Sequence, residues 1–125
     1  MCCLLAVALQ LVFVSTVFAN ELRRLTADEI IALLSGNTAV GLWDGKPYRQ
    51  YFASYGETIY AQPDTRSSVG KWRVNRTENV YESWWEMSDW SSYPVASDGK
   101  NMYWISNSLP PQKFSVLAGN QLVKK

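Results

Sequence analysis

Hydrophobic and polar residues follow two different periods along the chain. Near the N-terminal end, the apolar residues Ala27, Ile30, Ile31 and Leu34 are separated by intervals of one, three and four residues. These positions share one face of an α-helix. The pattern therefore predicts a short amphipathic helix over Thr26–Ser35.

The residues at both ends of this segment are typical helix caps. Thr26 and Glu29 have the spacing of a capping box, in which each side chain bonds to the other residue's backbone N–H. The carboxylates of Asp28 and Glu29 also suit the positive end of the helix dipole. Gly36 follows where a left-handed residue commonly ends a helix. These signals place the ends of the helix independently of its apolar face.

After Gly36 the pattern changes to short runs of β-forming residues separated by turn residues. Two of the turns contain Asp44-Gly45 and Asp98-Gly99, dipeptides typical of tight hairpins. The expected strands are Thr38–Trp43, Tyr48–Ser54, Thr58–Gln62, Val69–Val74, Val80–Met87, Ser92–Ala96, Asn101–Ser106 and Gln112–Ala118, with Gln121–Val123 as a short ninth candidate. Evenly spaced short strands of this kind predict an antiparallel meander.

A meander of this size tends to close on itself, because closure pairs its exposed edges. We therefore expect a mainly β fold: a small antiparallel barrel, or a strongly coiled sheet, of about eight strands, with the N-terminal helix plugging one end. No linker or internal repeat interrupts the pattern, so residues 20–125 are predicted to form a single domain.

A different pattern covers the first nineteen residues. Cys2–Phe18 is almost wholly apolar, and Val17 and Ala19 place small residues at the two positions that signal peptidase reads. The run is short for a membrane span, which needs about 20 apolar residues. We predict a cleaved secretory signal over residues 1–19 and a periplasmic or secreted protein without a stable membrane anchor. An uncleaved anchor and a buried helix are the alternatives.

The amino-acid composition excludes several kinds of partner, metal site and catalytic group. The chain has 125 residues and a net charge of +1, which argues against a nucleic-acid partner because such proteins are strongly basic. It contains no histidine, which excludes histidine bases and histidine metal ligands. Both cysteines, Cys2 and Cys3, lie in the predicted signal. We therefore expect no metal site, no cofactor, no disulfide and no cysteine nucleophile in the exported domain.

Three segments together resemble a known family. They are Leu25–Thr38, Tyr48–Phe52 and the Gly-Lys-Trp-Arg-Val stretch of Gly70–Val74. In these segments the chain is similar to the DUF995-type family, small exported proteins of alphaproteobacteria whose function is unknown. The resemblance implies an exported location and this type of fold, but no activity. Members often carry two cysteines after the Gly-x-Trp motif, where this chain has Tyr81 and Tyr93.

The longest predicted strand, Val80–Met87, carries candidate binding residues. Strand alternation places Glu82, Trp84 and Glu86 on one face, opposite Tyr81, Ser83, Trp85 and Met87. One interpretation is a groove in which Trp84 stacks on a sugar beside carboxylates; the other is a solvated face. Glu82 and Glu86 lie about 13 Å apart along a strand, farther than the roughly 5–9.5 Å between glycosidase carboxylates. By themselves they are not an acid–base pair.

Aromatic residues also gather on the strands that follow, where Trp90 and Trp104 come close to Trp84 in a meander. They form either an aromatic binding patch or ordinary core and cross-strand pairs. The candidate ligand-binding residues are Glu82, Trp84, Glu86, Trp90 and Trp104. The same alternation predicts that Trp72, which lies between Lys71 and Arg73, faces the core, whereas Trp84 faces outward or into a groove.

The preferred functional prediction is an exported, non-catalytic β-barrel module. Its expected partner is a small apolar molecule, a glycan or an envelope protein. The alternative is a carbohydrate-active enzyme that uses carboxylates such as Glu82, Glu86 or Asp89. The enzyme needs two carboxylates that converge in one cleft, and the spacing in the sequence does not provide them.

Overall fold

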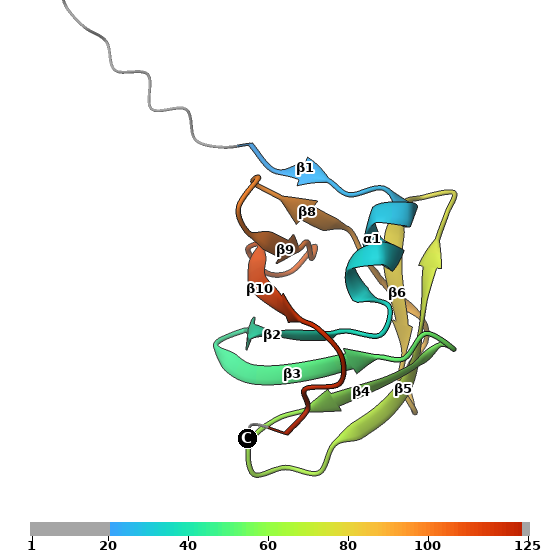
Figure 1. Cartoon of the computed structure of the whole chain (residues 1–125), viewed down its shortest axis with the longest axis vertical. Helices are drawn as coiled ribbons and strands as arrows, with labels where there is room; N and C mark the ends of the chain where they lie inside the picture. Colours follow the sequence, from blue (N-terminus) through green and yellow to red (C-terminus); the bar gives the residue numbers. More distant parts are fainter. Residues whose placement is uncertain (1–20, 124–125) are drawn as a thin grey trace, which may run out of the picture.

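The computed structural model describes residues 21–123, which form one ten-stranded antiparallel sheet and one helix (Figure 1). The helix is α1 (Ala27–Leu34). The strands are β1 (Arg23–Arg24), β2 (Thr38–Trp43), β3 (Lys46–Phe52), β4 (Glu57–Ala61), β5 (Ser68–Asn75), β6 (Val80–Trp84), β7 (Ser91–Tyr93), β8 (Val95–Ser97), β9 (Met102–Trp104) and β10 (Gln112–Leu117). The predicted mainly β fold with one N-terminal helix is confirmed.

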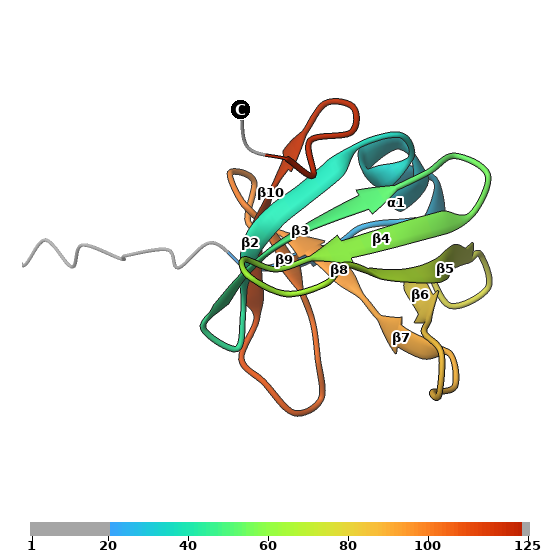
Figure 2. The ribbon, with the colours of Figure 1, turned by 90° about the horizontal axis from the view of Figure 1, so that it is seen from below.

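The sheet has the order β1-β8-β9-β10-β2-β3-β4-β5-β6-β7 and curls strongly into a half-barrel (Figure 2). β2 to β7 pair in sequence order, β8 to β10 do the same, and β10 returns to pair with β2. The result is two meanders joined side by side. Only Pro94 separates β7 from β8, although these strands lie near opposite ends of the sheet order. The curl of the sheet is what allows this short connection.

Pro94 explains why the single strand predicted over Ser92–Ala96 is two strands. Proline has no backbone N–H and cannot continue a hydrogen-bonded ladder. Tyr93 before it pairs with Tyr81 on β6, whereas Val95 after it pairs with Trp104 on β9. The chain therefore changes partner at the proline.

The other predicted strands lie within two residues of the observed ends, with two exceptions. β6 ends at Trp84, three residues before the predicted end, because a turn follows in which Ser88 N donates to Trp85 O (3.1 Å) and Met87 has a φ of 71°. Gln121–Val123 is not a strand, and the backbone N–H of Gln121 donates instead to the hydroxyl of Thr38 (2.9 Å). The two-residue β1 has no counterpart among the predicted strands.

The predicted helix caps are present. Thr26 Oγ1 accepts from Glu29 N (3.3 Å), and Glu29 Oε1 accepts from Thr26 N (3.1 Å), which completes the capping box. A contact that the local sequence does not reveal adds to this end: the side-chain oxygen of Asn79 accepts from Ala27 N (2.8 Å). The turn between β5 and β6 thus helps to position the helix, which packs against these two strands.

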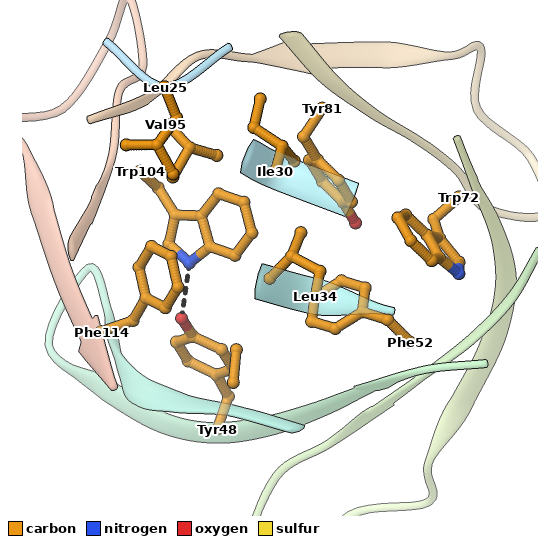
Figure 3. Close-up of a cluster of buried hydrophobic side chains, with 11 residues drawn as sticks. Leu25, Ile30, Leu34, Tyr48, Phe52, Trp72, Tyr81, Val95, Trp104 and Phe114 are labelled. Atoms are coloured by element: carbon orange, nitrogen blue, oxygen red, sulfur yellow. Dashed lines mark hydrogen bonds between the residues drawn. The ribbon is translucent and has the colours of Figure 1, made fainter. Parts of the chain in front are cut away.

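The core lies where α1 meets the concave face of the sheet. Ile30 and Leu34 are fully buried and point from the helix into a ring of aromatic side chains (Figure 3). Phe52 packs edge-on against Trp72 and Tyr81, with ring centroids 5.5 and 5.7 Å apart. Trp72 is 7% exposed, and its Nε1 donates to Ala53 O (2.8 Å), so its predicted inward orientation is confirmed.

The predicted signal over residues 1–19 lies outside the described residues, and its cleavage stays a prediction. Within residues 21–123, no helix combines the length and the apolar character needed to cross a membrane.

Candidate ligand-binding cavity

The interior of the half-barrel is not filled throughout. A cavity of about 360 Å³ lies beyond the helix-packed core. The eleven described residues that line it are aromatic or uncharged polar: Trp43, Tyr48, Gln50, Tyr60, Ser68, Tyr81, Ser83, Trp85, Ser91, Tyr93 and Trp104. A concave, mostly apolar space with a few polar groups is typical of a small-molecule site.

Strand alternation and register bring these side chains together. Tyr48 and Gln50 are two residues apart on β3, so they face the same side of the sheet. Gln50 pairs with Tyr60 on β4, which in turn pairs with Ser68 on β5. Inward-facing positions of neighbouring strands thus form one continuous cavity wall.

Gly70 on β5 allows a second wall to form. A Cβ atom at this position would lie 2.4 Å from Trp84 O and 2.6 Å from Cε3 of the Trp85 ring. Because glycine has no side chain, the Trp85 ring lies directly against the backbone of β5. There it meets Tyr60 edge-on, with centroids 6.1 Å apart. Glycine at residue 70 is therefore required for the observed position of the Trp85 ring.

A polar network crosses the inner end of the cavity. The hydroxyl of Thr58 donates to Tyr51 O (2.8 Å) and accepts from Nε2 of Gln50 (2.9 Å). The same Gln50 nitrogen donates to the Tyr81 hydroxyl (2.9 Å). Trp104 Nε1 donates to the Tyr48 hydroxyl (2.8 Å), as the dashed line in Figure 3 shows.

The cavity is electrically neutral. Burial raises the pKa of both Tyr48 and Tyr81 well above the usual value of 10, so these phenols keep their protons at physiological pH. None of the eleven lining residues is charged. An ion that entered would lose its hydration without meeting a charged partner among the lining residues.

The sequence-predicted residues Glu82 and Trp84 lie on the outer face of β6, as alternation predicted. The Glu82 carboxylate accepts from Arg73 Nε and from the Ser92 hydroxyl, both at 2.8 Å. Partial burial acts to raise the pKa of Glu82, but these hydrogen bonds outweigh burial and hold the pKa below its usual value. The carboxylate is therefore engaged in an ion pair on the outer surface.

Aromatic rings complete this outer cluster. The Arg73 guanidinium lies over the ring of Trp90, 3.8 Å from its centroid, and the Lys71 ammonium lies 5.2 Å from the centroid of a Trp84 ring. These are cation–π contacts that cover aromatic surface with charged groups. The structure thus brings together Glu82, Trp84 and Trp90, but around basic side chains rather than in a groove with a second carboxylate.

The other two predicted residues lie apart from this cluster. Glu86 is exposed in the turn that follows β6. Trp104 is only 3% exposed and lines the cavity, on the opposite side of the sheet from Glu82. The five residues therefore do not form one site, and a binding role for the outer four stays a prediction.

Most cavity residues were not among the predicted site residues. One signal could have identified them: Gln50 lies between Tyr48 and Phe52 on the same face of a predicted strand. A glutamine at an inward position has to be satisfied by internal partners, which indicates a polar feature inside the barrel.

Among residues 21–123, no group of three or more side chains suited to binding a metal lies together. Comparisons of the chain with protein-family models, with curated proteins and with solved structures found no match, so the family resemblance of the sequence stays a prediction.

Proposed function

We propose that this protein is a non-catalytic module that binds one small, uncharged, mainly apolar molecule in the cavity of its half-barrel. The observation that carries the proposal is the cavity itself: about 360 Å³, lined by seven aromatic and four uncharged polar side chains. Its volume is at the lower end of the roughly 300–1,000 Å³ typical of ligand pockets.

The lining supports an apolar ligand over a glycan. A sugar carries a hydroxyl on nearly every carbon, and each buried hydroxyl needs a hydrogen-bond partner. Both amide hydrogens of Gln50 are already engaged, by Thr58 and by Tyr81. The remaining lining is dominated by aromatic rings, whose burial favours apolar surface.

The lining also supports binding over catalysis. Hydrolysis of a glycoside by two carboxylates requires both to reach one substrate. No carboxylate lines the cavity, and Glu82 is held by Arg73 and Ser92 on the outer face. The lining of the cavity therefore provides no carboxylate pair for glycoside hydrolysis.

The apolar run and the small residues of residues 1–19 support a periplasmic or secreted location for this binding module. N-terminal sequencing of the product from its own host tests this part: export predicts a chain that begins at Asn20. A cytoplasmic product that begins at Met1 would contradict it.

Calorimetric titration of the purified protein tests the binding proposal. We expect methyl naphthyl ketone, a neutral aromatic probe, to bind with one-to-one stoichiometry. Naphthoate, an anion of similar shape, and maltotriose are expected to bind at least tenfold more weakly. Equal binding of the anion, or preferred binding of the sugar, would contradict the proposal.

Two variants of neighbouring residues locate the site. Ser91 lines the cavity, whereas Ser92 lies on the opposite face of the same short strand. Ser91→Phe partly fills the cavity and is expected to abolish binding of the ketone. Ser92→Phe is the matched control and is expected to retain it. Retention of full affinity by Ser91→Phe would place the ligand elsewhere.

A further inference from the structure

The hydrogen bonds at the inner end of the cavity leave two buried phenols, Tyr48 and Tyr81, with a hydrogen that a ligand can accept. The indole N–H of Trp104 can only donate, so at 2.8 Å the Tyr48 oxygen has to be its acceptor. A phenol has one hydrogen, and Tyr48 does not use it in this bond. Among the described residues no acceptor for it is present, and Tyr48 is buried except where it faces the cavity.

Gln50, another polar residue of the cavity wall, uses both hydrogens of its side-chain amide in hydrogen bonds to Thr58 and Tyr81. The single hydrogen of the Thr58 hydroxyl is given to Tyr51 O, so Thr58 can only accept from Gln50. This requirement fixes the orientation of the Gln50 amide, whose nitrogen also donates to Tyr81. Gln50 therefore has no hydrogen left for a ligand. Tyr81 only accepts in its bond with Gln50, so its own hydrogen is uncommitted, and Tyr48 and Tyr81 are the two candidate donors.

The side walls of the cavity are flat aromatic surfaces. Tyr60 stacks on Tyr48, with centroids 5.2 Å apart and rings 12° from parallel. Trp43 on β2 meets Tyr93 on β7 edge-on at 5.5 Å, although these two strands are not hydrogen-bonded neighbours. Flat walls of this kind favour a planar ring system, which can stack or pack edge-on against them.

We infer that the ligand is a neutral planar ring compound whose buried end carries a carbonyl or similar acceptor, which takes the hydrogen of a buried phenol, Tyr48 or Tyr81. This inference rests on the proposed function and names the ligand class of the same cavity. The raised pKa of Tyr48 agrees with it, because a phenol that stays protonated remains a donor. A buried phenol that donates to the ligand also lowers the affinity for analogues that lack the acceptor.

A pair of probes tests the inference with the full chain. Methyl naphthyl ketone and ethylnaphthalene have nearly the same shape, and only the ketone has an acceptor. We expect the ketone to bind about threefold to tenfold more tightly, the effect of one neutral hydrogen bond. Equal affinities would overturn the inference but leave the proposed function intact. Failure of both probes to bind would contradict the proposed function itself.

Three variants assign the preference to one residue. Either Tyr48→Phe or Tyr81→Phe is expected to bind both probes with equal affinity, which identifies the donor. Tyr60→Phe, which keeps the stacked ring, is expected to retain the preference for the ketone. A preference that survives in both Tyr48→Phe and Tyr81→Phe would overturn the inference. Because Tyr48→Phe also leaves Trp104 Nε1 without its acceptor, thermal unfolding has to show that the variant is folded.

A measurement on the unaltered protein provides an independent test. A hydrogen bond from a phenol lowers the carbonyl stretching frequency of the bound ketone below its value in an alkane. An infrared spectrum of the complex is expected to show this shift. An alkane-like frequency would overturn the inference even if Tyr48→Phe does not fold.

Discussion

The two ends of the half-barrel interior are built on the same strands but are filled differently. At the helix end, Ile30, Leu34 and Phe52 have no exposed surface. At the cavity end, Trp43, Tyr60 and Trp85 are partly exposed and surround about 360 Å³. One helix accounts for the difference: α1 fills one end, and no element among the described residues fills the other.

Element length explains why the helix fills only one end. α1 has eight residues and is about 12 Å long, because each helical residue rises 1.5 Å. β5 also has eight residues but extends about 26 Å, at roughly 3.3 Å per residue. A strand and a helix with equal numbers of residues therefore differ twofold in reach. A short helix packed on longer strands therefore leaves an interior space at the far end.

The largest expected effect distinguishes the two ends by stability. Trp72→Ala, at the helix end, is expected to lower the free energy of unfolding by about 3–5 kcal/mol, because a buried indole and its hydrogen bond to Ala53 are lost. Trp85→Ala, at the cavity end, is expected to cost clearly less because its side chain is only partly buried. Urea unfolding measures both. Equal losses would mean that the two ends are packed alike.

Gly70→Ala tests how the cavity wall is built. The added Cβ meets Trp84 O and the Trp85 ring at distances well below contact, so we expect a loss of about 1–3 kcal/mol in urea unfolding. Displacement of the Trp85 ring is also expected to weaken binding of methyl naphthyl ketone. Val69→Ala, at the neighbouring exposed position, is the control and is expected to keep the affinity. Unchanged affinity in Gly70→Ala would remove Trp85 from the site.

Alkaline pH tests the neutrality of the cavity end. Unfolded tyrosine ionises near pH 10, whereas burial raises the pKa of Tyr48 and Tyr81 in the folded state. Above pH 10 the unfolded state therefore loses protons that the folded state keeps, and stability falls as pH rises. Each phenol contributes a slope of up to about 1.4 kcal/mol per pH unit.

The alkaline slope is measured by urea unfolding at several pH values above 10. Tyr81→Phe is expected to have a shallower slope than the unaltered protein, because it lacks one of the two phenols. It is also expected to be less stable at neutral pH, since Gln50 loses the acceptor for one amide hydrogen. Stability that does not change between pH 10 and 11 would indicate that these phenols are accessible to water.

The smallest expected effect compares the two faces of β6. Trp84→Ala is expected to change the free energy of unfolding by no more than about 1 kcal/mol, since Trp84 lies on the outer face beside Lys71. Binding of the ketone is expected to stay unchanged, in contrast to Trp85→Ala. A Trp84→Ala variant that is less stable than Trp72→Ala would contradict the orientation of both side chains.

Features that depend on near neighbours in the chain can be predicted from the sequence. The capping box of Thr26 and Glu29, the hairpin at Asp44-Gly45 and the opposite orientations of Trp72 and Trp84 follow from local spacing. Each involves residues within a few positions of one another, where backbone geometry restricts the outcome. The fold class follows from the repetition of such local patterns.

The side chains that share the cavity are brought together by contacts between residues far apart in the sequence. Tyr48 meets Trp104 across 56 positions, and Gln50 meets Tyr81 across 31. The side chain of Asn79 accepts a hydrogen bond from the start of α1. At Pro94 the chain changes its pairing partner from β6 to β9. No local sequence pattern predicts either contact. Strand alternation predicts whether a residue faces inward. The position of each inward side chain, against the helix or beside the cavity, depends on register and curl, which only the assembled sheet establishes.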